Sequence, residues 1–125
     1  MPDPDAGQPP VLDGAVLAEL SASVQGDRAF VLELINAYLA DGAAHVDAIE
    51  AAIAADDAAA LVRPAHTLKS SSATVGAQRL AAVSRELELA GRSGSIGPAS
   101  AAPARAEWDA AVAALGTWIA GEQAR

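Results

Sequence analysis

Residues 65–76 read AHTLKSSSATVG and place an imidazole, an ammonium group and a run of small side chains on one predicted helix. At 100° per residue, the core-facing positions of this helix fall on one narrow stripe. These positions are Leu61, Ala65, Leu68, Ser72 and Val75. His66 points well away from the stripe, and Lys69 lies about one turn further along. The pattern therefore predicts a histidine that is presented to solvent beside a cation.

Apolar periodicity predicts four more helices around this segment, and no strand pattern occurs. Aspartates that can cap a helix precede the first three helices, at Asp13, Asp27 and Asp57. The five expected helices cover residues 13–24, 27–55, 57–75, 77–90 and 101–120. Because only one or two residues separate the third from the fourth, these two must form an antiparallel hairpin. The sequence predicts an all-α fold, an antiparallel four-helix bundle with a short extra N-terminal helix.

Composition divides the chain into one domain and two irregular segments. Residues 1–10 are rich in Pro, Asp and Gly, which predicts a disordered tail. Residues 11–121 are expected to form the bundle, and the turn formers of residues 91–100 predict a flexible loop within it. The chain has 125 residues, about half of them apolar, which is enough for one core and too few for two domains.

Two residues are unusual for their predicted helices. Gly42 costs about 1 kcal/mol relative to alanine in the middle of a helix. The apolar seam nevertheless keeps its phase across this glycine, which favours one continuous helix. Pro64 lacks the amide that would bond to the carbonyl of Ala60, so a bend is expected two residues before His66.

Charge and composition exclude several classes of protein. The net charge of −8 argues against general nucleic-acid binding, and the absence of cysteine excludes disulfides and thiolate metal sites. No apolar run approaches the roughly 20 residues of a membrane-spanning helix, and the acidic, Pro-broken start is unlike a secretory signal. A cytoplasmic protein without a membrane partner is expected. Residues 63–92 carry five basic and only two acidic side chains, a basic island that can steer an acidic partner.

The chemistry of the chain is concentrated at His66. An imidazole near neutral pH can attack phosphorus or shuttle protons, and Lys69 can neutralise phosphoryl oxygens. Glu88, on the adjoining predicted helix, can accept the proton of one ring nitrogen and leave the other free to attack. The alternative is a solvated surface histidine with no chemical role. His45 is interpreted as a partly exposed bundle residue, and no metal site is predicted because the two histidines lack typical ligand spacing.

Several positions on the third and fourth predicted helices match the signature of a known family. They are His66, Leu68, Lys69, Ser70, Gly76, Leu80, Leu87 and Glu88. In this order and spacing they resemble the signature of histidine-containing phosphotransfer (HPt) domains. The resemblance covers almost the whole chain, because the order and the lengths of the helices also match. One departure is Ser70, where the family most often has glycine; serine is still small, so docking of a partner is expected to survive.

The resemblance implies a four-helix bundle whose exposed histidine accepts a phosphoryl group from an aspartyl phosphate on a response-regulator receiver domain. The histidine then passes this group to another receiver. By position, His66 is the phosphorylated residue, Lys69 stabilises the phosphoryl charge, Glu88 orients the imidazole, and Gly76 makes the turn into the hairpin. Small or flanking side chains around the histidine are expected to meet the partner. They are Val62, Arg63, Ser70 and Ala73.

The same resemblance implies which partners to expect. They are receiver domains and, as a further partner, a hybrid sensor histidine kinase. The divalent metal is expected on the receiver, so no cofactor is expected on this chain. No Gly-rich nucleotide loop occurs, which predicts a phosphoryl carrier and not an enzyme with its own ATP site. A monomer is expected. Two alternatives stay open at this point. One is a non-catalytic HPt-like module that sequesters a signalling partner, and the other is the phosphorylated N-terminal module of a chemotaxis-type kinase.

Overall fold

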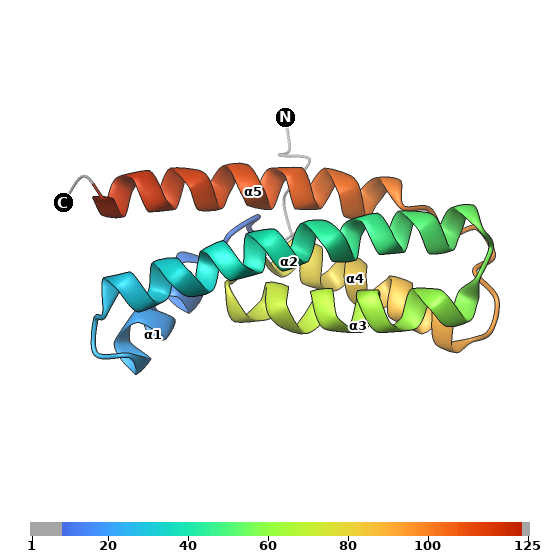
Figure 1. Ribbon diagram of the computed structural model, residues 1–125, viewed down its shortest axis with the longest axis horizontal. Helices are drawn as coiled ribbons and strands as arrows, with labels where there is room; N and C mark the ends of the chain where they lie inside the picture. Colours follow the sequence, from blue (N-terminus) through green and yellow to red (C-terminus); the bar gives the residue numbers. More distant parts are fainter. Residues whose placement is uncertain (1–8, 124–125) are drawn as a thin grey trace, which may run out of the picture.

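A computed structural model describes residues 9–123 of the chain, and five helices with short connections account for them (Figure 1). The helices are α1 Gly14–Ser23, α2 Arg28–Ala54, α3 Ala58–Thr74, α4 Gln78–Arg92 and α5 Ala102–Gln123. The four longer helices lie along one common direction, and the short α1 lies at one end of them (Figure 1). No strand occurs within residues 9–123. The predicted all-α bundle with a short extra N-terminal helix is confirmed.

The three predicted caps are present at the starts of α1, α2 and α3. The carboxylates of Asp13, Asp27 and Asp57 accept hydrogen bonds of 3.0–3.1 Å from backbone N–H groups in the first turn of each helix. Such a bond satisfies one of the N–H groups that has no partner inside the helix. The predicted tail of residues 1–10 lies outside the described residues except for Pro9 and Pro10. The carbonyl of Pro9 accepts a hydrogen bond of 2.6 Å from Arg79 Nε of α4.

The core consists of aliphatic side chains from all five helices that face the interior of the bundle. Its largest fully buried members are Leu17, Val31, Ile35, Val46, Ile49, Leu61, Leu68, Val75, Leu80 and Leu115. Two polar groups inside this core satisfy each other, because the hydroxyls of Tyr38 and Ser72 share a hydrogen bond of 2.8 Å. Pro64 is buried within α3, which is helical on both sides of it. The bend expected at this proline stays a prediction.

Gly42 allows α2 to pack closely against α5. The helix continues through this residue without a break, as its apolar seam indicates. A Cβ atom added at Gly42 would lie less than 3.0 Å from ring carbons Cη2 and Cζ3 of Trp108, a separation that real Cβ atoms do not show. Trp108 is 5% exposed, and its ring also meets that of Tyr38, with a centroid distance of 5.6 Å. The indole therefore occupies the space that a side chain at position 42 would need.

The α3–α4 hairpin turns at Gly76, as predicted. Gly76 has a φ of +83°, a conformation that favours glycine. A second constraint acts on the same residue, because the N–H of Asp13 donates a hydrogen bond of 2.8 Å to the Gly76 carbonyl. A Cβ atom at position 76 would lie 2.7 Å from the carbonyl oxygen of Asp13. The hairpin turn is thus also where the chain entering α1 packs.

The sequence prediction placed the end of the fourth helix too early. Helix α4 continues to Arg92, so the first two residues of the predicted 91–100 loop are helical. Gly91 is buried in this last turn, where a Cβ atom would lie 2.9 Å from both the Ala58 carbonyl oxygen and Val62 Cγ2 of α3. The close approach of α3 stabilises a helical turn that local composition does not favour. The remaining connection, residues 93–101, buries Ile96 against the core, and α5 runs to Gln123, two residues past the predicted end of the bundle.

No helix within residues 9–123 combines the length and the apolar character that crossing a membrane requires.

Candidate functional site

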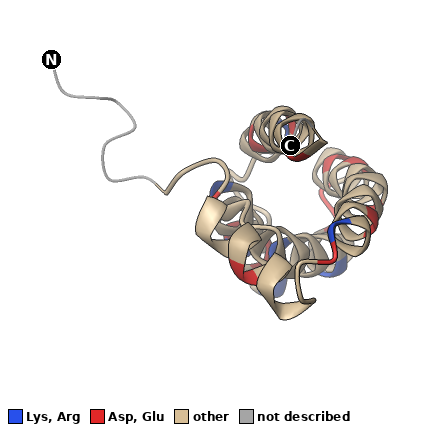
Figure 2. Ribbon diagram, turned by 90° about the vertical axis from the view of Figure 1, so that its left-hand side faces the viewer, with Lys and Arg blue, Asp and Glu red and all other residues tan. Residues whose placement is uncertain are grey.

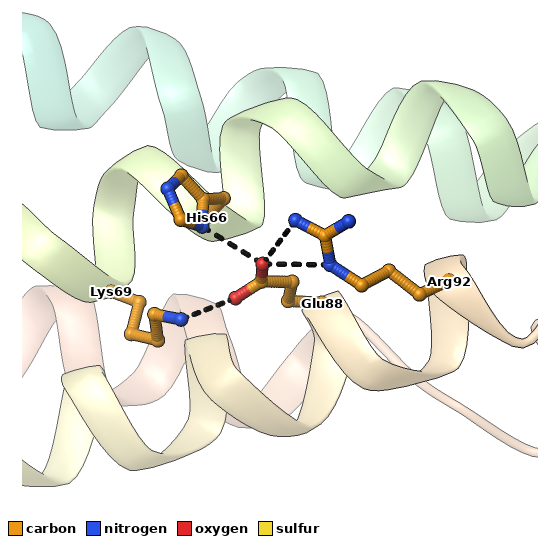
Figure 3. Close-up of polar contacts among 4 residues, drawn as sticks. All are labelled: His66, Lys69, Glu88 and Arg92. Carbon is orange, nitrogen blue, oxygen red and sulfur yellow. Dashed lines mark hydrogen bonds and ion pairs between the residues drawn. The ribbon is translucent and has the colours of Figure 1, made fainter.

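Helices α3 and α4 bring together four polar side chains on the surface of the bundle (Figure 3). His66 and Lys69 come from α3, and Glu88 and Arg92 come from α4. The His66 side chain is 52% exposed, in agreement with its predicted position away from the core stripe, whereas Glu88 is only 6% exposed. Leu68 and Leu87 are buried in the core and hold both helices in place. The site is therefore an exposed imidazole above a buried carboxylate.

The imidazole is held by one hydrogen bond. Nδ1 of His66 lies 2.8 Å from Oε2 of Glu88. Because an ionised carboxylate can only accept hydrogen bonds, Nδ1 must carry the proton and donate it. In the neutral ring the second nitrogen, Nε2, then has a free lone pair, and Figure 3 shows it on the side of the ring that faces away from Glu88. The arrangement favours one tautomer of the neutral ring, in which the nitrogen that faces away from Glu88 is unprotonated.

Glu88 accepts from two cations as well as from the histidine. Lys69 Nζ donates a hydrogen bond of 2.6 Å to Oε1. Arg92 donates two to Oε2, from Nε at 2.9 Å and from Nη2 at 2.8 Å. The bonds from Lys69 and Arg92, with a smaller contribution from His66, lower the pKa of Glu88 to about 2, although burial acts in the opposite direction. Glu88 is therefore ionised throughout the neutral pH range.

Two residues of the site have no role in the sequence-based prediction. In that prediction, Arg92 is only one of the five basic residues in residues 63–92, and Gly91 is the first residue of a loop. The signal for Arg92 is its spacing, because it follows Glu88 by four residues and (i, i+4) Glu–Arg pairs face each other on a helix. That signal requires α4 to continue through Gly91, which the structure shows it does.

The residues predicted to meet a partner surround His66 on α3. Arg63, Ser70 and Ala73 are exposed, and Val62 is half-buried because its side chain also packs against Gly91. Their docking role stays a prediction. His45 lies half-buried on α2, as expected for a bundle residue.

Charge is divided between the two sides of the bundle. The described basic residues other than Arg28 and Arg105 lie on α3 and α4, whereas seven of the fourteen described acidic residues lie on α2 and α5 and only two on α3 and α4 (Figure 2). Within residues 9–123, no group of three His, Cys, Asp or Glu side chains comes together in a way that could hold a metal ion. The site therefore offers a nucleophilic nitrogen and cations on a basic surface, the combination expected for handling a phosphoryl group.

Comparison with known proteins agrees with this chemistry. The family model described as Hpt domain matches residues 33–118, so the chain belongs to the Hpt domain family. Among solved structures, the chain is similar to histidine-containing phosphotransfer protein B (HptB) from Pseudomonas aeruginosa PAO1. The match has a TM-score of 0.78 and 28% sequence identity, and it covers 88% of this chain and 95% of that one. No curated protein was found to match the chain.

The family and the structural match together support a histidine phosphotransfer role. The resemblance stated from residues of α3 and α4 is thereby confirmed.

Proposed function

We propose that the chain is a phosphorelay intermediate that carries a phosphoryl group on Nε2 of His66. The group comes from an aspartyl phosphate on a response-regulator receiver domain and passes to a second receiver domain. The observation that carries this proposal is the hydrogen bond between Nδ1 of His66 and Glu88, on an exposed ring whose other nitrogen faces away from that carboxylate. Family membership supplies the reaction class.

The reaction needs little from the chain beyond positioning and charge. The lone pair of Nε2 attacks phosphorus, and the bond between phosphorus and the aspartate oxygen breaks, so that the aspartate leaves as a carboxylate. Nδ1 keeps its proton, and the ring becomes positively charged. The ionised Glu88 carboxylate, 2.8 Å from Nδ1, stabilises that charge. Reversal of these steps on a second receiver returns the ring to its neutral form.

The partner's surface must fit the exposed α3 face. We propose that Arg63, Ser70, Ala73 and the accessible part of Val62 contact the receiver around His66. Their arrangement supports this, because small side chains beside the ring allow another backbone to approach, and the basic surface favours an acidic partner. The divalent metal that phosphoryl transfer requires would reside in the receiver.

A carrier explains the site better than a sequestering module does. A module that only binds a partner needs neither an oriented imidazole nor a carboxylate that is buried and shared with two cations. Taking ions out of water is costly, and Glu88 is 6% exposed. Such an arrangement is expected where the ring has to react.

The test is phosphoryl transfer from a phosphorylated receiver domain to the full chain. His66→Gln should fold normally and accept no label, whereas His45→Gln, which changes the other histidine, should accept as much label as the parent. The label on the parent should be lost in acid, because phosphoramidates hydrolyse there and phosphoserine does not. Undiminished labelling of His66→Gln would remove His66 from its role.

A further inference from the structure

The two oxygens of Glu88 have different partners. Oε2 accepts three hydrogen bonds, one from His66 Nδ1 and two from Arg92. Oε1 accepts one, from Lys69 Nζ. The link between the carboxylate and the imidazole therefore uses a different oxygen from the link to Lys69.

Lys69 is the cation that can move. It follows His66 by three residues on the same helix, and its flexible side chain is held in place at one atom. Arg92 lies on the opposite helix and holds one carboxylate oxygen with two donors of a rigid guanidinium group. In Figure 3, Arg92 and Lys69 approach the carboxylate from opposite sides, so one can leave without displacing the other.

We propose that Glu88 performs two tasks, each with a different oxygen. Through Oε2, which Arg92 fixes, it holds the proton on Nδ1 of His66; through Oε1 it retains the Lys69 ammonium until a phosphoryl group on Nε2 competes for it. Arg92 is thus a positioning residue that acts through Glu88. This inference rests on the proposed function of His66 and adds how the same site is regulated.

The consequence is a competition between carboxylate and phosphoryl group for one cation. The Lys69 ammonium cannot neutralise the phosphoryl oxygens fully while Glu88 attracts it. Glu88 also stabilises the protonated ring, which is the better leaving group in phosphoryl transfer. Both effects act in the same direction, so Glu88 should shorten the lifetime of phosphohistidine and favour onward transfer.

The first test measures the tautomer of His66 and needs no phosphoryl group. In the 15N-labelled full chain, two-bond proton–nitrogen correlations distinguish protonated Nδ1 from protonated Nε2. The parent should show the Nδ1–H form. In Arg92→Gln the ratio of Nδ1–H to Nε2–H should fall by about threefold to tenfold, tenfold being roughly the loss of one hydrogen bond to a charged acceptor.

Arg85→Gln is the matched control, because Arg85 is exposed on the same helix and forms no ion pair with Glu88 among the described residues. Its tautomer ratio should equal that of the parent. Arg92→Lys should recover part of the ratio, since it restores a charge but only one donor at a time. An unchanged ratio in Arg92→Gln would overturn the positioning role of Arg92.

The second test measures the lifetime of phosphohistidine after phosphorylation by phosphoramidate. In this reaction the lone pair of Nε2 forms the bond to phosphorus as ammonia leaves, and phosphorus NMR follows the loss of the product. Glu88→Gln should lengthen the lifetime at least about two- to fivefold, the range of an exposed ion pair, because the Glu88 carboxylate is more buried than in such a pair. Lys69→Ala should shorten it, and the double variant should outlast Lys69→Ala by a smaller factor than Glu88→Gln outlasts the parent, because only the effect of Glu88 on the ring remains.

The outcomes separate this inference from the proposed function. A lengthening by Glu88→Gln that is as large without Lys69 as with it, or no change at all, would show that Glu88 does not retain Lys69. Failure of His66 to accept phosphate from either phosphoramidate or a receiver would instead contradict the proposed function. The tautomer measurement stands in either case, because it uses the unphosphorylated chain.

Discussion

The substitution Gly42→Ala should destabilise the bundle, although alanine is the better helix former. Replacing glycine in mid-helix by alanine gains about 1 kcal/mol where space is free. At position 42 the new Cβ would lie less than 3.0 Å from two ring carbons of Trp108, which is 5% exposed. The indole is rigid and must move as a whole, and overpacking of this kind costs about 1–3 kcal/mol, occasionally more. The net change expected is a loss of up to about 2 kcal/mol.

Gly116→Ala is the matched control for this substitution. Gly116 lies within α5, and a Cβ atom there would meet nothing within 4 Å. The same chemical change should therefore stabilise the chain by up to about 1 kcal/mol. Urea unfolding followed by circular dichroism measures both, with opposite shifts of the midpoint and unchanged slopes. Trp108→Phe should reduce the cost of alanine at position 42, because it removes part of the ring system that the new Cβ meets.

If Gly42→Ala raises the unfolding midpoint as much as Gly116→Ala does, the close packing of α2 on the indole is wrong. The mid-helix glycine would then need another explanation.

Three further predictions concern the site and the core. Gly91→Ala would bring a Cβ atom to 2.9 Å from α3 at two points, so it should push α4 away, destabilise the chain by about 1 kcal/mol and lower the Nδ1–H signal of His66 in nitrogen NMR. Tyr38 is the only tyrosine, and burial raises its pKa to about 12; ultraviolet titration should show ionisation near that pH, and stability should fall as the pH rises from about 10 toward 12. The depressed pKa of Glu88 means that its contribution to stability is present above about pH 4.5 and is lost as the pH falls toward 2. Acid unfolding of Glu88→Gln should lack this part of the pH dependence.

Much of the fold could be predicted because the relevant signals are local. Each cap requires only an aspartate before an apolar period, and the exposed position of His66 follows from its angle on α3 relative to Leu68. The length of the α3–α4 connection fixes the antiparallel hairpin. Gly76 is recognisable as a turn residue, although the chain that packs on it near Asp13 is 63 residues away in sequence and gives no local signal.

The features that escaped prediction depend on contacts between distant residues. The sequence GRSGSIGPAS has the composition of a loop, yet its first two residues are helical because Gly91 packs on Ala58. With the helix end placed before Gly91, the Glu88–Arg92 pair could not be recognised. The role of Gly42 likewise depends on Trp108, 66 positions later, and one sequence alone does not show that these two residues meet.

The central claim is that Nε2 of His66 is the atom that bears the phosphoryl group. Nitrogen–phosphorus NMR of the 15N-labelled chain, recorded after incubation with a phosphorylated receiver domain, tests this claim at the level of the atom. The account predicts a one-bond coupling between phosphorus and Nε2 of His66, with Nδ1 still protonated. Coupling to Nδ1, or a phosphorus signal that belongs to any other residue, would contradict it.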